Sequence, residues 1–201
     1  MLRVGLTGGL ASGKSFVGHA LADLACHLIE ADELGHQVLL PGWEAYAAVV
    51  REFGNEILDT QGFIDRARLS ALVWHAPERL ETLNSLVHPP VIAREEHMLA
   101  EIANKDPQAI VLVAAAILVE TGRYKRFDRL IVVVCDREQQ IERAIRRGPY
   151  TREQVLARLS RQLPLEEKLR VADYVIDTSG TKENTLEHVR AVYGSLRSLS
   201  A

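Results

Sequence analysis

The sequence of 201 residues predicts an α/β fold in which a five-stranded parallel sheet lies between layers of helices, a three-layer α/β/α arrangement. Five short apolar runs lack the strict alternation of strands that face water on one side. Segments with helical spacing of apolar residues separate these runs. A glycine-rich loop joins the first run to the first such segment. Strands that alternate with helices in this way indicate a parallel sheet with crossover helices.

The predicted strands and helices follow one another along the chain. The strands are Leu2–Leu6, His27–Ile29, Ala109–Val113, Leu130–Cys135 and Tyr174–Ile176. The helices are Ser15–Leu24, much of Pro41–Ala103, Arg137–Arg147, Arg152–Leu163 and Lys182–Leu199. Residues 34–87, between the second and third strands, contain no convincing strand, so we expect an all-helical insertion there. Its aromatic side chains are expected in its own core.

Residues 8–15 read GGLASGKS and match the phosphate-binding loop (P-loop) pattern G-x-x-x-x-G-K-[ST]. The glycines let successive backbone N–H groups turn toward phosphate oxygens. Lys14 can place a mobile charge on the β and γ phosphates, and Ser15 can offer its hydroxyl to Mg²⁺. The following helix adds the positive end of its dipole. We therefore predict a nucleotide-phosphate site formed by Gly9, Leu10, Ala11, Ser12, Gly13, Lys14, Ser15 and Phe16.

Asp32 follows the second predicted strand, and Glu30 is a weaker candidate at the same place. A right-handed crossover makes this strand parallel to the first, so its carboxyl end shares a sheet edge with the phosphate loop. A carboxylate at this edge could orient or deprotonate an acceptor hydroxyl, or hold a Mg²⁺-bound water. The alternative is that Asp32 only caps a helix that starts near Glu33.

The stretch from Arg137 to Glu167 is rich in arginine and is interrupted by Gly148-Pro149, a loop signal. Two helices joined by such a loop could form a mobile lid over phosphates, or they could simply present a solvated basic face. Arg143 and Arg147 share one helix face, as do Arg158 and Arg161. The arginines of this stretch are Arg137, Arg143, Arg146, Arg147, Arg152, Arg158 and Arg161.

The composition limits the classes of function. A net charge of −3 gives no general basic character for binding nucleic acid or an anionic membrane. Cys26 and Cys135 stand in apolar runs, so we expect buried thiols and neither a disulfide nor a metal pair. The longest apolar run, residues 109–119, is too short to cross a bilayer, and no signal peptide is recognisable. We therefore expect a cytoplasmic protein.

Other classes of phosphate-loop protein carry motifs that this chain lacks. A GTPase reads guanine with Asn/Thr-Lys-x-Asp, whereas residues 104–107 read NKDP and residues 181–184 read TKEN. A motor-type ATPase usually has a strand that ends in acidic residues, but the third strand runs into alanines at 114–116. A small-molecule kinase remains. The alternatives are a kinase for another small hydroxyl or nucleoside monophosphate acceptor, and a regulatory protein that binds ATP without catalysis.

Beyond the phosphate loop, the sequence resembles the dephospho-coenzyme A kinase family over nearly its whole length. The resemblance rests on short pieces in the family's order. They are LTGGLASGKS (6–15), IEAD (29–32), PG (41–42), FG (53–54), QGFIDR (61–66), LNSLVHP (83–89), AILVE (116–120), Arg158 with Gln162, EK (167–168) and AD (172–173). Three pieces depart from the usual pattern: Glu30 and Ala116 replace an aspartate and a proline, and Thr178-Ser179-Gly180 stands where an asparagine is common.

The resemblance implies ATP-dependent phosphorylation of the ribose 3′-hydroxyl of dephospho-CoA, with ATP and Mg²⁺ as cofactors. It implies a nucleotide-binding core of residues 1–33, 88–137 and 168–201, an acceptor domain of residues 34–87 and a lid of residues 138–167. His88 could contact substrate or only shape the turn before Pro89. The implied catalytic residues are Asp32, Lys14, Arg143 and Arg147, with Ser15 as metal ligand. The implied substrate-binding residues are Asp32, His88, Leu118, Glu120, Arg158 and Gln162.

Overall fold

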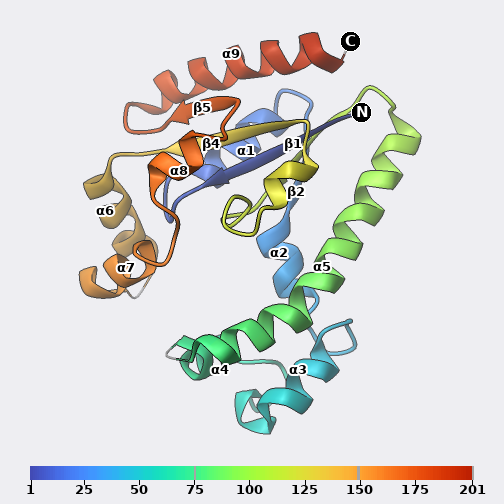
Figure 1. The fold of residues 1–201 in the computed structure, drawn as a ribbon, viewed down its shortest axis with the longest axis vertical. Helices are drawn as coiled ribbons and strands as arrows, with labels where there is room; N and C mark the ends of the chain where they lie inside the picture. Colours follow the sequence, from blue (N-terminus) through green and yellow to red (C-terminus); the bar gives the residue numbers. More distant parts are fainter. Residues whose placement is uncertain (75, 149, 201) are drawn as a thin grey trace. The chain divides into compact units, whose positions relative to one another are not determined.

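The computed structural model describes residues 1–74, 76–148 and 150–200. Five parallel strands form one sheet in the order β2-β3-β1-β4-β5, which confirms the predicted α/β class (Figure 1). All five predicted strands are present, with ends that differ by one or two residues. They are β1 (Leu2–Gly8), β2 (His27–Glu30), β3 (Ile110–Ala114), β4 (Arg129–Val134) and β5 (Tyr174–Asp177).

Each predicted helix is present among the described residues, with one correction to an end, and two short helices at residues 123–126 and 165–169 lie outside the predicted ranges. The predicted helix from Arg152 to Leu163 ends at Leu159, because a turn and Pro164 follow. Pro149 of the predicted loop signal lies outside the described residues. The helices are α1 (Lys14–Ala22), α2 (Ala31–Gln37), α3 (Tyr46–Phe53), η1 (Asn55–Ile57), α4 (Arg66–Trp74), α5 (Pro77–Lys105), η2 (Arg123–Arg126), α6 (Arg137–Arg147), α7 (Arg152–Leu159), α8 (Leu165–Leu169) and α9 (Lys182–Ser200).

One face of the sheet packs against α1 and α9, and this contact is the main core of the protein. Alternate residues of the central strands, such as Val4 and Leu6, meet Val17 of α1 and Val189 of α9, and all four are fully buried. The central-strand residues that alternate with these, such as Val111 and Val132, are fully buried on the opposite face. A continuous apolar strand sequence is therefore required, because both faces of a parallel sheet are covered.

Strand β1 continues to Gly8, two residues beyond the predicted end. Gly8 is paired in register with Val133 of β4. A side chain at Gly8 would lie only 2.5 Å from Ser12 Oγ and 2.7 Å from the backbone oxygen of Val133. The glycine thus lets the strand and the following loop approach each other closely.

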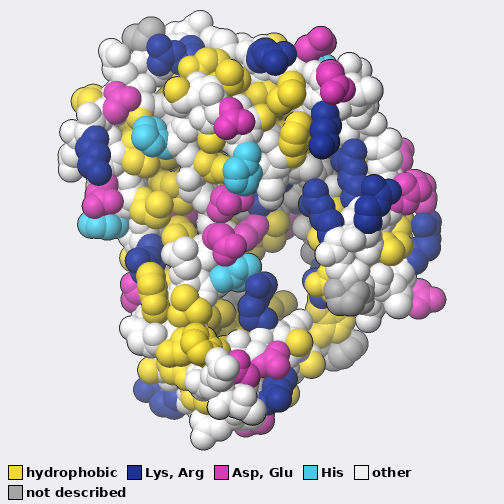
Figure 2. All heavy atoms as spheres, turned by 180° about the vertical axis from the view of Figure 1, so that it is seen from behind, with side chains coloured by type: hydrophobic (Ala, Val, Ile, Leu, Met, Phe, Trp, Pro, Cys, Tyr) yellow, Lys and Arg dark blue, Asp and Glu magenta, His cyan; other side chains and the backbone are white. Residues whose placement is uncertain are grey.

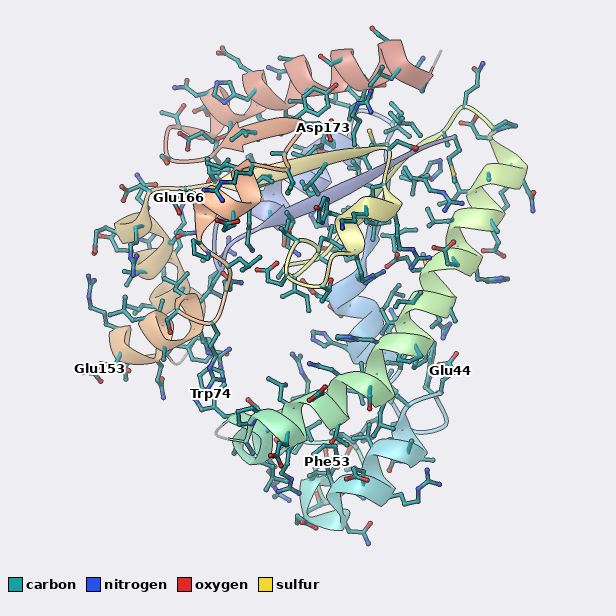
Figure 3. All side chains as sticks on the ribbon, in the orientation of Figure 1. Glu44, Phe53, Trp74, Glu153, Glu166 and Asp173 are labelled. Atoms are coloured by element: carbon teal, nitrogen blue, oxygen red, sulfur yellow. The ribbon has the colours of Figure 1, made fainter. Side chains whose placement is uncertain are left out.

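The described chain divides into two compact units, residues 1–30 with 102–201, and residues 31–101. The second unit is helical, as predicted for the insertion, and Phe53 is buried in it (Figure 3). Trp43 is half-buried under the Arg94 guanidinium, which lies 4.1 Å from the ring centroid. The predicted boundary between residues 87 and 88 falls inside α5.

Helix α5 corrects the expectation of a turn at His88-Pro89. Residues 88–90 lie within the helix, and Pro89 and Pro90 interrupt its backbone hydrogen bonding. Figure 1 shows α5 changing direction along its length, and proline is a common cause of such a bend. His88 therefore occupies a helical position in the second unit, which removes the turn-shaping alternative.

Two further observations concern the described residues as a whole. Cys26 and Cys135 are free, buried thiols, as the sequence predicts. In the part of the chain that the structure describes, no helix combines the length and apolar character that a membrane span needs.

Candidate active site

The phosphate loop turns sharply between β1 and α1 because two of its residues adopt left-handed backbone conformations. Gly13 has φ +91° and Ala11 has φ +55°. The Ser12 N–H donates to the Gly9 carbonyl at 3.1 Å, which closes the loop, and the Val17 N–H donates to Gly13 at 3.1 Å as the helix begins. Gly13 suits its position because glycine adopts positive φ without steric cost.

This loop places several hydrogen-bond donors and one cation where an anion can bind. Lys14 and Ser15 form the first turn of α1, whose N-terminus carries the positive end of the helix dipole. Among the described residues, the N–H groups of Ala11, Gly13 and Ser15 donate no hydrogen bond that closes the loop. The side chain of Ser15 is exposed, and Phe16 beside it is half-buried. The loop therefore has the donors that a nucleotide phosphate requires.

Side chains cap the N-termini of α6 and α7, the two helices of the predicted lid. The Asp136 carboxylate accepts hydrogen bonds from the N–H groups of Glu138 and Gln139, which caps α6. Thr151 and Gln154 form a reciprocal capping box at the start of α7. Figure 2 shows Lys and Arg side chains gathered on this side of the first unit, and Figure 3 shows Glu153 on α7.

An apolar cluster joins these helices to the phosphate loop. Ile141, Ala144 and Val155 are buried, and Leu10 and Ala11 of the loop pack against them. In addition, the Leu10 N–H donates to Gln162 Oε1 at 2.9 Å. The segment after α7 thus contacts the phosphate loop directly.

The arginines predicted for the lid have different surroundings. The guanidinium of Arg143 is half-buried and donates to the carbonyl of Thr178 at 2.8 Å. Arg147, one turn later, is exposed. Arg158 is half-buried and stacks over Tyr150, with 4.3 Å between its central carbon and the ring centroid. Of these three arginines, only Arg147 is exposed.

A cavity of about 460 Å³ lies beside Gly9, between the carboxyl end of β4, the first turns of α6 and residues 159–168. Its polar lining includes Gln140, Gln162 and Lys168. Glu166 of α8 also lines it and is labelled in Figure 3. A side chain on Gly9 would approach Gln140 Nε2 to 2.8 Å, so glycine keeps this wall open. The cavity adjoins the first residues of the phosphate loop and can hold part of a ligand bound there.

Two predicted substrate residues follow β3. Leu118 is buried and packs close to Gly5 of β1. Glu120 forms an ion pair with Lys168, whose ammonium also donates to the Ala116 carbonyl at 3.3 Å. The Leu163 N–H donates to Glu120 Oε1 at 3.4 Å. Glu120 therefore connects α8 and Leu163, at the end of the predicted lid segment, to the residues that follow β3.

Asp32 and His88 belong to the second unit. Asp32 is exposed and stands two residues after the end of β2. Because α2 begins at Ala31, Asp32 lies in the first turn of the helix and not at its cap. An acidic side chain in that turn interacts favourably with the helix dipole. His88 is half-buried within α5.

Sequence reasoning assigned no role to three residues that contact the phosphate loop or residues bonded to it, although it noted Thr178 as a departure from the family pattern. Thr178 directly follows β5, and Gln139 and Gln140 lie in the first turn of α6, which follows β4, so all three are near the carboxyl edge of the sheet where ligands bind. Position alone could have singled out Thr178, because it directly follows a predicted strand. For the two glutamines no sequence signal distinguishes a contact with the loop from a solvated helix face.

Comparison with known proteins agrees with this geometry. A model of the family "Dephospho-CoA kinase" matches residues 2–184. The dephospho-CoA kinase of Carboxydothermus hydrogenoformans is 39% identical over 189 residues, covering 94% of this chain and 91% of the relative. That of Aquifex aeolicus is 38% identical over 196 residues, covering 98% of each. A crystal structure of a Thermus thermophilus protein superposes with a TM-score of 0.80 at 29% identity, covering 97% of each chain. The chain therefore belongs to the dephospho-CoA kinase family.

Proposed function

We propose that this protein transfers the γ-phosphoryl group of ATP to the ribose 3′-hydroxyl of dephospho-CoA and releases CoA and ADP. The observation that carries the proposal is a complete phosphate loop at the carboxyl end of the sheet in a chain of this family. The proposed partner is a small molecule, and free buried thiols at Cys26 and Cys135 agree with a cytoplasmic location.

Phosphoryl transfer depends mainly on positioning and on neutralising charge. The N–H groups of Ala11, Gly13 and Ser15 would hold the phosphate oxygens, and Lys14 would carry its charge to the β and γ phosphates. The exposed hydroxyl of Ser15 fits a Mg²⁺ ion that takes most of its ligands from phosphate and water. Magnesium, when bound with ATP, supplies positive charge to the phosphate oxygens.

Asp32 is proposed to align the acceptor hydroxyl and to accept its proton. A carboxylate suits this role because its oxygens can accept a proton, and the Asp32 side chain is exposed. Arg147 and Arg158 are proposed to approach the transferring phosphoryl group when the lid, residues 138–167, closes. Closure would exclude water, which would otherwise compete with the acceptor.

The remaining predicted residues are proposed to serve the acceptor. Residues 34–87 and His88 would contact dephospho-CoA directly. Gln162 lines the cavity beside Gly9, and Glu120 accepts a hydrogen bond from Leu163 of the same lining, so both would act at this cavity. Leu118 would support this region from the core.

The test is ADP release with Mg·ATP in the presence of dephospho-CoA, AMP, adenosine or no acceptor. The expected result is strong stimulation by dephospho-CoA alone, with a product of the mass of CoA. Stimulation by another acceptor would retain the kinase mechanism and change the substrate. ATP binding without acceptor-dependent ADP release would indicate a regulatory nucleotide-binding protein and would refute the proposal.

A further inference from the structure

Thr178, the first residue after β5, contacts the phosphate loop through the carbonyl of Ser12. It is 5% exposed, and its Oγ1 donates to the Ser12 carbonyl at 2.7 Å. The same side chain packs on Gly13, where an added Cβ would lie 3.0 Å from Thr178 Oγ1. Thr178 thus reaches the loop across a separation of 166 residues in sequence.

Arg143 of α6 fixes the direction of this hydroxyl. Its Nη1 donates to Thr178 Oγ1 at 2.9 Å, and its Nη2 donates to the Thr178 carbonyl at 2.8 Å. A hydroxyl has one hydrogen and accepts on its lone pairs. Since Arg143 can only donate, the Thr178 hydrogen is left for a carbonyl acceptor. The Ser12 carbonyl at 2.7 Å is closer than that of Val134 at 3.2 Å.

A second set of contacts holds Arg143 and the residues after β5 together. Arg143 Nη2 also donates to Gln139 Oε1 at 3.2 Å, and Gln139 Nε2 donates to the Ser179 carbonyl at 3.0 Å. The pKa of Asp177 lies below its ordinary value, mainly because the Ser179 side chain hydrogen-bonds to it, and Arg143 adds a smaller favourable charge. Arg143 is therefore fixed at both ends of its planar group, as bidentate recognition by guanidinium requires.

We propose that Thr178 and Arg143 are positioning residues for the nucleotide, acting through the Ser12–Gly13 peptide. A trans peptide is planar, so its carbonyl and its N–H point in opposite directions. When Thr178 holds the Ser12 oxygen behind the loop, the Gly13 N–H points to the other side, where the loop offers donors to phosphate. Neither side chain needs to touch ATP. The inference rests on the proposed function only in taking ATP as the nucleotide.

These hydrogen bonds also explain why Arg143 is half-buried whereas Arg147 is exposed. Both were expected over the phosphates because they share a helix face. Arg143 instead uses its donors on Thr178 and Gln139, and Arg147 is the exposed member of the pair. In this proposal Arg143 holds the phosphate loop in place, and Arg147 is the arginine that can reach the ligand.

The experiment compares Thr178→Val with Thr178→Ser in the full-length protein. ATP binding is measured by calorimetry without acceptor, and KM and kcat are measured with dephospho-CoA. Valine keeps the shape but removes the hydroxyl, which leaves a buried carbonyl unpaired, and we expect about tenfold weaker ATP binding. Serine should keep the affinity, and KM for dephospho-CoA should change less than about twofold in both variants.

Thr185→Val is the matched control. Thr185 is 2% exposed, and its hydroxyl donates to the carbonyl of Thr181 at 3.1 Å, with that of Asp177 at 3.5 Å, and not to the phosphate loop. Its loss should lower thermal stability and leave ATP affinity unchanged. Equal weakening of ATP binding in Thr185→Val and Thr178→Val, or unchanged binding in Thr178→Val, would overturn the proposal.

Arg143→Gln keeps the proposal testable if the valine variant does not fold. It should weaken ATP binding in the same way, whereas Arg146→Gln, an equal charge change at an exposed position of α6, should not. In the double variant Arg143→Gln/Thr178→Val, the two losses should not add, because both act on one peptide. If the two losses of ATP affinity were strictly additive, Arg143 and Thr178 would not act on the same peptide. Absence of dephospho-CoA phosphorylation by the unaltered protein would refute the proposed function alone, since ATP binding remains measurable.

Discussion

The ammonium nitrogen of Lys168 lies 2.6 Å from Oε1 of Glu120, and the pair is removed from water, with exposed side-chain fractions of 2% and 16%. Oε2 of Glu120 is buried without a hydrogen-bond partner among the described residues. Transfer of both charges from water costs free energy, which their attraction offsets only while both are present. The pair connects α8 to the segment after β3, where the lid segment returns to the sheet.

Glu120→Gln should therefore destabilise the fold strongly. It leaves the Lys168 charge buried without its counter-ion, and breaking such a pair costs about 3–5 kcal/mol. Urea unfolding should show a correspondingly lower free energy of unfolding. In the double variant Glu120→Gln/Lys168→Met, most of this loss should be recovered, because no charge remains buried.

The exposed pair Arg170–Glu167 provides the control. Its charged atoms are 2.7 Å apart, nearly as close as the 2.6 Å of the buried pair, but its side chains are 72% and 46% exposed. Glu167→Gln should change the free energy of unfolding by less than about 1 kcal/mol. Similar losses in Glu120→Gln and Glu167→Gln would show that burial does not determine the strength of the first pair.

The fold could be predicted from the sequence because its strongest signals are local. Apolar runs and helical spacing locate the strands and helices, and the phosphate loop fixes the first crossover. The ends of elements were less predictable. Helix α5 passes through Pro89 and Pro90, although proline usually ends a helix, so packing overrides the local preference there.

The sequence motifs located the residues of the candidate site, but they could not predict which side chains contact one another there. The motif locates Lys14 and Ser15, since their roles follow from the geometry of the loop. It does not reveal that Arg143 bonds to Thr178, because helical spacing identifies only a shared face. Likewise, the pairing of Glu120 with Lys168 depends on the path of the chain after α7.

Asp32→Asn should lower kcat by at least about a hundredfold, the contribution of a positioned base. Asparagine keeps the shape of the side chain but cannot accept a proton, and ATP affinity should be unchanged because the phosphate loop is intact. The measurement is steady-state kinetics with dephospho-CoA together with ATP calorimetry.

Glu33→Gln is the companion variant for this comparison. Glu33 stands next to Asp32 in the first turn of α2 and bonds His36 at 3.0 Å. Glu33→Gln removes the same charge as Asp32→Asn but leaves Asp32 in place, so its kcat should remain close to that of the unaltered protein. Near-normal turnover in Asp32→Asn would assign this residue to helix α2 and not to catalysis.

The stability of the fold should depend on the protonation of Cys26 at alkaline pH. Burial raises the pKa of this thiol from 9.0 to about 11, and Arg197 opposes the rise in part. Above pH 9 the unfolded chain releases the proton and the folded chain keeps it, so stability falls as pH rises through this window. The Tm of the unaltered protein should therefore drop more between about pH 8 and about pH 10.5 than that of Cys26→Ala. Parallel decreases in the two proteins would exclude a contribution from this thiol.

Gln162 tests whether the segment after α7 lies against the phosphate loop when ATP binds. Its Oε1 accepts the Leu10 N–H at 2.9 Å, so a carboxylate in Gln162→Glu can keep this bond while it places a negative charge at the loop. Repulsion between that charge and the phosphates should weaken ATP binding by on the order of tenfold, and added salt should reduce the effect. Gln154→Glu makes the same charge change on α7 and preserves the capping box with Thr151, so its ATP affinity should stay unchanged. If both variants bind ATP equally well, the segment after α7 does not lie against the phosphate loop when the nucleotide binds.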